Sequence, residues 1–483
     1  MGKLTKIAVM VSLLIALTSC TGLFNEAPQE EWGQVKVWVT TADQSKLLQP
    51  EEDITFTFDD ESHDTTITID EEVKYQQMDG FGAAMTDSSA WLIANKLKPE
   101  QQDELMKKLF DHDLGIGISY LRLPMGASDF ALSMYTYNDV PEGQRDPELQ
   151  QFSVEHDKTY IIPTLVQARE INPELKLMAS PWSAPAWMKT SESLIGGSLK
   201  REYYQAYANY FTKFIQAYEK EGLPIDAVTP QNEPHHEPAD YPGMRMEAMD
   251  QAEFIKNNLG PAFEENGLNT KIVIWDHNWD EPNYPIAVLN DAEAKPYIAG
   301  SAFHGYAGDV QNQSKVHDKH PDHAIYFTES SGGEWATDFG GNLKWDMQNL
   351  VIGASRNWAR TVLKWNLALD ENHGPTNGGC QDCRGIITID QTGNVTFNEE
   401  YYAFGHASKF VKPGAHRIDS NTFGNGNIEN VAFKNPDGTK VMVAINSASE
   451  EKKFKVRWGE KSFLYKLPPG AAASFVWSGT PEE

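Results

Sequence analysis

The feature that most constrains the fold is a regular alternation, in the middle of the chain, of short apolar runs with amphipathic segments. Eight of these runs have the length and the β-branched or aromatic content of buried strands. They are Gly80–Met85, Ser119–Pro124, Leu175–Ala179, Ala227–Pro230, Lys271–Trp275, Ser301–His304, Ile325–Thr328 and Val362–Trp365. Segments between them, such as Arg201–Lys220, Ala252–Glu265 and Asp346–Ala359, have the apolar spacing of amphipathic helices. Eight strands joined by helices predict a parallel sheet that closes into a (β/α)8 TIM barrel.

Both ends of the chain have a different pattern, that of half-buried strands. Apolar and polar residues alternate near the N-terminus in Val35–Val39, Ile54–Phe58 and Thr65–Ile69. The same alternation returns near the C-terminus in Val441–Ile445 and Ala473–Trp477. Period-two alternation is typical of strands with one face in a core. The sequence therefore predicts two β-rich ends that flank an α/β middle.

The N-terminus has the pattern of an export signal. Lys3 and Lys6 precede an apolar run, Ile7–Leu17, that is too short to span a bilayer. The run leads into Leu-Thr-Ser-Cys ending at Cys20, which resembles the lipobox of bacterial lipoproteins. The resemblance implies that residues 1–19 are removed, that Cys20 is acylated, and that residues 20–33 form a tether. We therefore expect an exported bacterial lipoprotein at the outer membrane; an ordinary secretory signal with a chance cysteine is the alternative.

The other two cysteines, Cys380 and Cys383, have the spacing C-x-x-C. One such pair cannot complete a four-ligand zinc site, and the sequence has no second pair. Outside the cytoplasm, a small disulfide that pins a loop suits this spacing. A thioredoxin-like redox site is the alternative, although no helix-forming run follows Cys383.

The composition narrows the class of ligand. The chain has 69 Asp and Glu against 41 Lys and Arg, a net charge of −28. This excess disfavours nucleic acid and anionic membrane surfaces, because both bind clustered cationic side chains. The 13 Trp, 18 Tyr and 22 Phe exclude disorder over most of the length and suit a neutral sugar. We therefore expect no nucleic-acid partner, and membrane contact only through a lipid at Cys20.

Two glutamates follow predicted barrel strands directly. Glu233 lies in Asn-Glu-Pro after the fourth strand, and Glu329 follows the seventh. A TIM barrel places its active site at the carboxyl ends of its strands, so both side chains can face one mouth. Two carboxylates across one cleft are what glycoside hydrolysis requires. Taken singly, either glutamate is equally well explained as a carboxylate at a helix N-terminus.

Other strand ends carry residues that suit a sugar site. They are Asp87, Arg122, Trp182, His304 with Tyr306, and Trp365. Flat aromatic rings stack on pyranose faces, and carboxylates accept protons from hydroxyl groups. A single Trp is more often a core residue than a ligand platform, and a single His is usually a satisfied interior residue. Packing in a core does not require all of these residues to fall at strand ends, whereas a sugar site at the barrel mouth does.

Several blocks of sequence, in this order, resemble glycoside hydrolase family 30 between Met78 and Val411. They are Asp79–Asp87, Leu121–Met125 with Ser128–Phe130 and Tyr135–Tyr137, Ala179–Thr190, Asn232–Pro234, His304–Tyr306, Glu329, Lys364–Leu369 and Gly405–Phe410. The resemblance implies a (β/α)8 barrel over residues 75–411. It also implies a β-sandwich side domain built from both chain ends, residues 34–74 and 412–483.

The resemblance further implies a retaining double displacement with Glu329 as nucleophile and Glu233 as acid/base. Asn232 would hold the sugar 2-hydroxyl, while Arg122, His304 and Tyr306 would orient Glu329 and keep it ionised. Asp87, Trp182 and Trp365 would line the subsite of the non-reducing-side sugar, and Tyr241 matches an aromatic residue beside the acid/base. The pKa values of the two glutamates must then be driven apart. Neither a metal nor an organic cofactor is needed, and we expect a monomer.

The loop Asn377–Gly385, which contains both cysteines, resembles the β-1,6-glucanase branch of the family, and Ser331 departs from the glucosylceramidase branch. This favours endo-acting cleavage of β-1,6-glucan, with β-glucan as the partner. An exo-β-glucosidase, a β-xylosidase and a xylanase are the alternatives within the family. A glycan-binding lipoprotein without catalysis is the alternative from another class, although binding alone does not require two opposed carboxylates.

Overall fold

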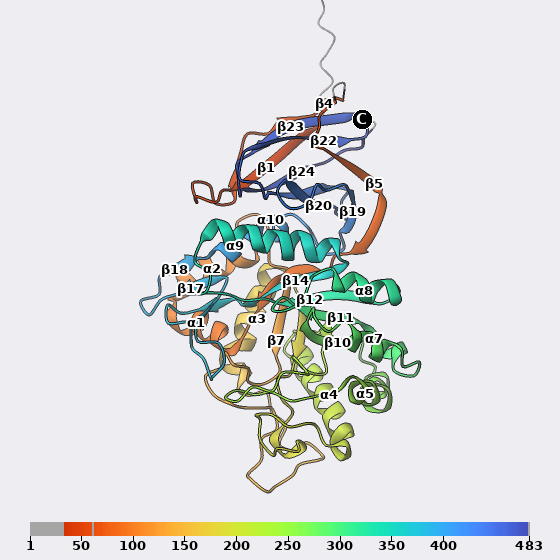
Figure 1. Ribbon diagram of the computed structural model, residues 1–483. Helices are drawn as coiled ribbons and strands as arrows, with labels where there is room; N and C mark the ends of the chain where they lie inside the picture. The colour runs from red at the N-terminus through yellow and green to blue at the C-terminus, as the bar shows by residue number, and fades with distance from the viewer. Residues whose placement is uncertain (1–32, 60–61, 482–483) are drawn as a thin grey trace, which may run out of the picture. The chain divides into compact units, whose positions relative to one another are not determined.

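A computed structural model describes residues 33–59 and 62–481; the predicted signal peptide, Cys20 and nearly all of the predicted tether lie outside these residues. Within the described part, eight parallel strands close a barrel in the order β10-β11-β12-β14-β6-β7-β8-β9. The strands are β6 (Gly80–Ala84), β7 (Tyr120–Pro124), β8 (Lys176–Ser180), β9 (Ala227–Val228), β10 (Lys271–Asn278), β11 (Ile298–His304), β12 (Ala324–Glu329) and β14 (Ala359–Asn366). All eight predicted strands are confirmed, with ends that differ by a few residues. Figure 1 labels β7, β10, β11, β12 and β14 among the barrel strands.

Helices surround the barrel. They are α1 (Asp87–Lys96), α2 (Pro99–Phe110), α3 (Ile161–Ile171), α4 (Tyr204–Lys220), α5 (Ala248–Phe254), α6 (Gly260–Glu265), α7 (Asn283–Leu289), α8 (Asn312–Lys319), α9 (Phe339–Trp345) and α10 (Glu399–Ser408). Two predicted helices contain π-helical turns, η4 (Ile255–Leu259) between α5 and α6, and η6 (Asp346–Ala354) after α9. The predicted end of the last helix at Ala359 is wrong, because Ala359 already begins β14.

Strands from both chain ends form the side domain. In the described residues they make one hydrogen-bonded sheet in the order β2-β1-β24-β21-β20-β19-β5-β22-β23-β4, with β3 paired to β1. The strands are β1 (Gln34–Thr40), β2 (Gln49–Pro50), β3 (Ile54–Thr55), β4 (Thr57–Phe58), β5 (Thr66–Gln77), β19 (His416–Ser420), β20 (Ile428–Lys434), β21 (Lys440–Asn446), β22 (Lys452–Trp458), β23 (Lys461–Leu467) and β24 (Ala472–Trp477). Two further small sheets are formed by β13 (Gly332–Gly333) with β16 (Cys383–Arg384), and by β15 (Ala368–Leu369), β17 (Ile387–Ile389) and β18 (Val395–Phe397).

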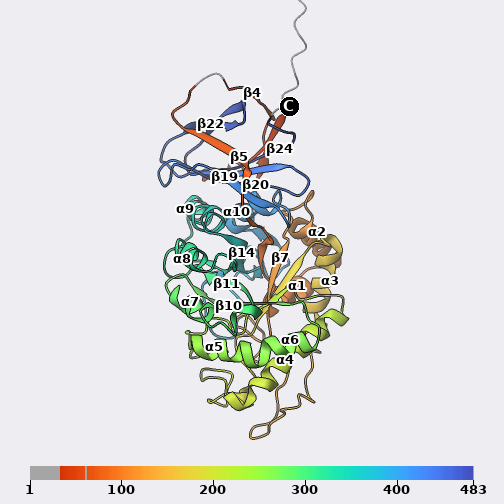
Figure 2. The same cartoon turned by 90° about the vertical axis from the view of Figure 1, so that its right-hand side faces the viewer.

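The sheet folds over an aromatic core. Phe475 on β24 packs against Phe454 and Phe463 on β22 and β23, with ring centroids 6.0 and 5.5 Å away. The long strand β5 joins the two layers, because it pairs with β22 on one side and with β19 on the other. Figure 2 shows β5 running from the side domain towards the barrel. The expected boundary at residue 75 falls inside β5, which continues to Gln77.

The helix α10 connects the barrel to the side domain. His406 on α10 is fully buried; its ring nitrogens lie 2.8 Å from Ser474 Oγ on β24 and 2.9 Å from Thr40 Oγ1 on β1. Trp38 and Phe410 pack nearby with tilted rings, whose centroids are 4.4 Å apart. Side-domain residues such as Val443 share one hydrophobic core with the barrel. The two parts are therefore joined by a continuous core and by polar contacts.

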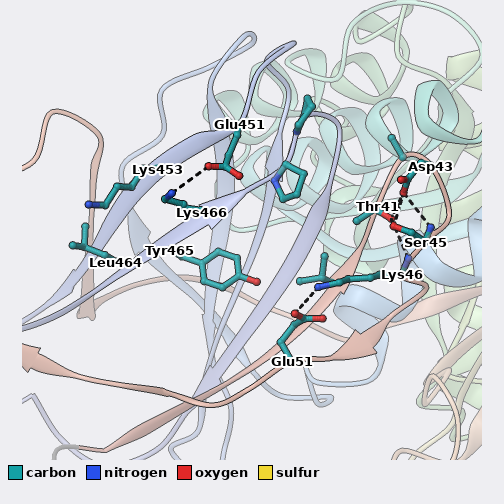
Figure 3. A pocket seen from close by; sticks show the side chains of 14 residues that line it. Thr41, Asp43, Ser45, Lys46, Glu51, Glu451, Lys453, Leu464, Tyr465 and Lys466 are labelled. Atoms are coloured by element: carbon teal, nitrogen blue, oxygen red, sulfur yellow. Dashed lines mark hydrogen bonds and ion pairs between the residues drawn. The ribbon is translucent and has the colours of Figure 1, made fainter.

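A surface cavity of about 870 Å³ lies on the side domain (Figure 3). Tyr465 and Leu464 line it, together with charged side chains that pair with each other, as Lys46 does with Glu51 at 2.6 Å. Lys466 and Glu451 form a second pair at 3.6 Å. No helix in the described part of the chain is long and apolar enough to cross a membrane.

Candidate active site

The structure brings both predicted glutamates to the barrel mouth. Glu329 is the last residue of β12, and its carboxylate accepts hydrogen bonds from Arg122 at 2.5 Å and from the Tyr306 hydroxyl at 2.9 Å. Glu233 lies in the loop after β9 with a positive φ of 45°, and its amide donates to the Asp276 carbonyl. A non-glycine residue in the left-handed region costs free energy, and such strain clusters at functional sites. Surrounding contacts hold Glu233 in this conformation.

The guanidinium of Arg122 is completely buried and organises the floor of the site. It bonds to Glu329, and its Nη2 donates to Asn232 Oδ1 and to Asp276 Oδ2, both at 2.7 Å. Because Asn232 Oδ1 is occupied in this way, the amide nitrogen of Asn232 is left to face a ligand. A buried cation stabilises ionised neighbours, so Arg122 favours the charged forms of Asp276 and Glu329.

Asp276 is a functional residue that the sequence interpretation missed. Its carboxylate also accepts hydrogen bonds from Ser180, Thr229 and Thr328, each at 2.8 Å, and lies 3.1 Å from His304 Nε2. Burial raises the pKa of Asp276, but the Arg122 charge and the His304 hydrogen bond lower it far more, so the carboxylate is ionised. Asp276 directly follows the fifth predicted strand, the one strand end for which no candidate was named.

A bulge in β10 explains how Asp276 reaches the barrel interior. Trp275 and Asp276 both have positive φ, 72° and 64°, and the pairing of β10 with β11 shifts register between Trp275 and His277. Trp275 packs outside the barrel against Tyr284, with ring centroids 4.4 Å apart. In a regular strand, Trp275 would share a face with Val273, which lies in the cluster inside the barrel. The extra residue of the bulge shifts this alternation by one position. The bulge thus keeps Trp275 outside while Asp276 points inward.

His304 lies between the two glutamates, and its contacts differ from the expectation that it orients Glu329. Its Nδ1 is 3.1 Å from Glu233 Oε1, and its Nε2 is 3.1 Å from Asp276 Oδ1 but 3.9 Å from Glu329 Oε2. His304 therefore bonds directly to Glu233, and it acts on Glu329 through its charge. His277 adds a second imidazole, whose Nδ1 is 3.4 Å from Glu233 Oε1.

These contacts set the protonation states of the free site. Burial lowers the pKa of His304, but the charge of Glu329 and hydrogen bonds to Asp276 and Glu233 raise it to about 9. Burial raises the pKa of Glu233, and hydrogen bonds from His277 and His304 reverse this and lower it. Burial raises the pKa of Glu329, while the positive charges of His304 and Arg122 lower it. Repulsion from Glu233 and Asp276 raises it further, and the net pKa lies above the usual value. The two pKa values are driven apart, but in the free site the higher one belongs to Glu329.

Aromatic rings form one wall of the mouth. Trp182 and Trp365 stack with ring centroids 4.9 Å apart, and the Arg122 guanidinium lies 4.9 Å from the Trp182 ring and 5.5 Å from the Trp365 ring. Phe130 belongs to the same cluster, and Tyr241 packs against it. Burial raises the pKa of Tyr241, and repulsion from Asp129, Glu233 and Glu329 adds to the rise. The Tyr241 hydroxyl bonds to His236 at 2.8 Å.

Asp87 is the first residue of α1 and is almost completely buried. Its carboxylate accepts hydrogen bonds from the Tyr160 hydroxyl at 2.6 Å and the Leu132 amide at 2.8 Å, and lies 2.9 Å from His156 Nε2. The sequence interpretation did not include His156 or Tyr160, because neither falls at a strand end. Their bonds fix the Asp87 carboxylate in one orientation beside the mouth.

The predicted disulfide is present between Cys380 and Cys383. The segment that carries it pairs with the loop after the nucleophile, because β16 lies antiparallel to β13 with Gly333 opposite Cys383. Cys383 also belongs to the cluster that contains Trp182 and Trp365. The disulfide therefore stiffens a loop that contacts both the aromatic wall and the segment following Glu329.

Within the described residues, one group of side chains has the geometry to hold a metal ion, namely Glu233, His277 and His304. Their ligand atoms lie within 4.8 Å of one another. Glu233 Oε1 and His304 Nδ1 already share the 3.1 Å contact that places a proton beside Glu233, and a metal ion would displace that proton. The donor set therefore fits acid/base chemistry at Glu233 without a metal.

A closed parallel barrel with two buried glutamates, an arginine and stacked tryptophans at the carboxyl ends of its strands defines a glycosidase type of site. The model of the glycosyl hydrolase family 30 TIM-barrel domain matches residues 78–411, and that of the family's beta sandwich domain matches residues 414–475. The chain therefore belongs to glycoside hydrolase family 30.

Curated relatives and a solved structure agree with this assignment. The chain is 36% identical to endo-1,6-beta-D-glucanase neg1 of Aspergillus fumigatus, over 77% of this chain and 79% of that one. It is 31% identical to lysosomal acid glucosylceramidase of Mus musculus, over 85% and 83%. The solved structure of the endo-beta1,6-glucanase BT3312 superimposes with a TM-score of 0.86 at 36% identity, covering 93% of this chain and all of that one.

Proposed function

We propose that the protein is a retaining endo-β-1,6-glucanase that cleaves β-1,6-glucan by double displacement. One observation carries the choice of substrate: several of the most similar relatives, at 34–36% identity, are endo-1,6-β-glucanases, and so is the solved structure at 36% identity. The cysteine-pinned loop beside the mouth supports the same branch of the family. The substrate is thus a neutral glucan, which suits the aromatic wall of the site.

In the first step, Glu329 attacks the anomeric carbon while Glu233 donates a proton to the departing oxygen. Arg122 and Tyr306 hold the attacking carboxylate by hydrogen bonds to its two oxygens. The attack requires an ionised Glu329, and the adjacent guanidinium favours that form. Asn232, whose side-chain oxygen is bound to Arg122, presents its amide to the 2-hydroxyl of the sugar.

Glu233 needs a proton for this step, and in the free site its carboxylate is ionised. The nearest proton is on His304, whose Nδ1 is 3.1 Å from Glu233 Oε1. We propose that substrate binding, which excludes water, moves this proton along the hydrogen bond onto Glu233. His304 then becomes neutral, and its Nε2 retains the bond to Asp276.

In the second step, the ionised Glu233 removes a proton from a water molecule, which attacks the glycosyl–Glu329 ester. The sugar leaves with its original anomeric configuration, and Glu329 is released as a carboxylate. Glu233 ends the cycle protonated, and return of this proton to His304 restores the free site. This exchange of roles requires Glu233 to gain and lose a proton easily, and two neighbouring imidazoles suit that requirement.

A time course of products from pustulan, laminarin and xylan tests the proposal. An endo-β-1,6-glucanase releases a ladder of oligosaccharides from pustulan early and leaves xylan intact. Release of glucose alone would identify an exo-β-glucosidase, and cutting of xylan with intact pustulan would refute the β-1,6 preference. Binding of pustulan without any new reducing ends would support a glycan-binding protein without catalysis.

The location is a separate proposal that rests on residues outside the described part of the chain. We propose that Cys20 is acylated and tethers the enzyme to the outer membrane. Cells that express the Cys20→Ser variant should lose incorporation of labelled fatty acid into the protein and release it from the membrane fraction. Equal incorporation into the variant would refute the lipid anchor and leave the ordinary secretory signal.

A further inference from the structure

A second cavity, of about 720 Å³, lies beside the catalytic mouth. We call it the side pocket and define it by Tyr306, Trp335, Trp345, Asp346, Glu399 and Glu400. Its volume is within the range of small-molecule sites. Tyr306 lines the side pocket and also donates its hydroxyl to Glu329. Ser330, the residue after Glu329, lines it as well, so the side pocket shares a wall with the nucleophile.

Exposed aromatic rings form the entrance of the side pocket. Trp335 is 56% exposed, Tyr306 45% and Trp345 41%, and all three are among the exposed large hydrophobic residues of the described part of the protein. Burial of such rings against a ligand is favourable, and their faces suit the flat apolar face of a pyranose. Clustered exposed apolar side chains mark interaction sites more often than single ones do.

The base of the side pocket contains buried carboxyl oxygens that lack partners. Glu399 is 4% exposed, and neither of its carboxyl oxygens has a hydrogen-bond partner within residues 33–59 and 62–481; the same holds for Oε2 of Glu400. An unpaired buried polar group costs about 1–3 kcal/mol, so such groups are rare unless a ligand or water satisfies them. Glu399 and Glu400 both line the side pocket, so a small rotation of their side chains would bring these oxygens to a hydroxyl group bound there.

The charges around Glu399 are otherwise paired. Lys364 donates to both oxygens of Asp346 at 3.0 Å, and Arg384 Nε donates to Glu400 Oε1 at 2.9 Å. Burial raises the pKa of Glu399 well above its usual range, and repulsion from Asp346 and Glu400 adds to the rise, so Glu399 is neutral. The charges of Asp346 and Glu400 are thus balanced by Lys364 and Arg384, and no net charge is left for an ion to neutralise. This favours an uncharged ligand.

A glycine makes this arrangement sterically possible. A Cβ at Gly332 would lie closer to Glu400 Oε1 than any contact allows, and 3.0 Å from Arg384 Nη2. Gly332 follows the nucleophile by three residues and pairs with Arg384 across β13 and β16. The wall between the mouth and the side pocket is therefore closely packed rather than a gap between loosely placed loops.

We propose that the side pocket is a substrate subsite that binds a neutral glucosyl unit of the glucan other than the one that Glu329 attacks, with the sugar stacked on Trp345 and its hydroxyls bonded to Glu399 and Glu400. The inference rests on the proposed function, since it takes the ligand to be part of the substrate. Such a subsite makes the enzyme prefer glucan chains long enough to fill both the mouth and the side pocket.

The test compares kcat/KM for β-1,6-linked glucose oligomers of increasing length in the full-length enzyme. Trp345→Ala should lower kcat/KM about tenfold for the longer oligomers and by no more than about twofold for the shortest one cleaved, because only longer chains reach the ring. Leu464→Ala is the matched control: Leu464 has the same 41% exposure but lines the cavity on the side domain. It should change kcat/KM by less than about twofold at every length.

Glu399→Gln provides a second variant with nearly unchanged shape. It should weaken activity on longer oligomers severalfold with the same dependence on length, while melting temperatures confirm that both variants are folded. A loss that is equal at all lengths, or no loss at any length, would overturn the subsite. If the wild-type enzyme cleaves another glucan and not the β-1,6 series, the proposed function fails, and the same length series with that glucan decides the role of the side pocket.

Discussion

Two histidines of this protein are buried to the same extent and yet have opposite charge states. His304 at the barrel mouth and His406 between the barrel and the side domain are both fully inaccessible. Three carboxylates surround His304 and raise its pKa to about 9. His406 contacts two hydroxyl groups, and burial lowers its pKa to about 3. Burial alone favours the neutral form, so the neighbours decide which form is present.

The contrast separates two kinds of buried polar group. At the mouth, cations and ionised carboxylates are held together for chemistry, and burial, together with repulsion from Glu233 and Asp276, raises the pKa of Glu329. At the junction with the side domain, a neutral ring satisfies Ser474 and Thr40 and supports the packing of α10. Removal of the Glu329 charge at the mouth should therefore abolish activity and spare stability, whereas substitutions at the junction should do the reverse.

The largest effect is expected for Glu329→Gln. Loss of the nucleophile should lower kcat for every substrate by about 10⁴-fold or more, because no other carboxylate can form the glycosyl ester. Burial disfavours the charge of Glu329 in the folded protein, so the free energy of unfolding should stay equal or rise by about 1 kcal/mol. Reducing-end assays and urea unfolding measure the two quantities. A marked loss of stability would remove the distinction between mouth and junction.

A smaller and more selective effect is expected for Glu233→Ala. Loss of the acid should slow cleavage of glucan by about 10²–10⁴-fold but should affect aryl glucosides with good leaving groups much less. Azide should restore part of the turnover of the activated substrates, since a small anion can occupy the space of the side chain. Equal losses for all leaving groups would contradict the acid role of Glu233.

The smallest effect concerns stability and its dependence on pH. His406 has a folded pKa below its unfolded value, so its contribution is intact above about pH 6.5 and is lost as pH falls towards 3, by up to about 4 kcal/mol. His304 has a raised pKa, so its contribution is intact below about pH 6.5 and is lost as pH rises through about 9. The free energy of unfolding, measured across pH, should lose acid sensitivity in His406→Gln and alkaline sensitivity in His304→Asn.

Activity gives the control for that comparison. His406→Gln should keep kcat/KM within about twofold near neutral pH, whereas His304→Asn should lose most activity, because it removes the proton next to Glu233. If both variants changed the free energy of unfolding only at acid pH, or only at alkaline pH, the assignment of opposite charge states would be wrong.

Much of the fold could be predicted from the sequence, because it depends on periodicity. Buried parallel strands are short apolar runs, and all eight were found, as were the alternating strands of both chain ends. The π-turns η4 and η6 were not predicted, since one extra residue per turn hardly alters apolar spacing over a short helix. The pairing of β13 with β16 was also not predicted, because Gly332 and Gly333 carry no apolar signal.

The site was predictable where its residues follow strands, as Glu233, Glu329 and Arg122 do. It was not predictable where three-dimensional contacts decide the role. The closer contact of His304 with Glu233 depends on a difference of under 1 Å, and Tyr160 reaches Asp87 from the start of α3. Asp276 required knowledge of a bulge, which period-two alternation cannot reveal.

The bulge in β10 has a consequence for anyone who redesigns this scaffold. Regularising the strand with both residues kept would restore plain alternation from Val273, which lies in the cluster inside the barrel, and would turn Trp275 inward and Asp276 outward. An indole would then occupy the space of the carboxylate, and Arg122, Ser180, Thr229, Thr328 and His304 would all lose a common acceptor. A strand with better geometry would yield a barrel without a working centre, so the irregularity must be copied and not corrected.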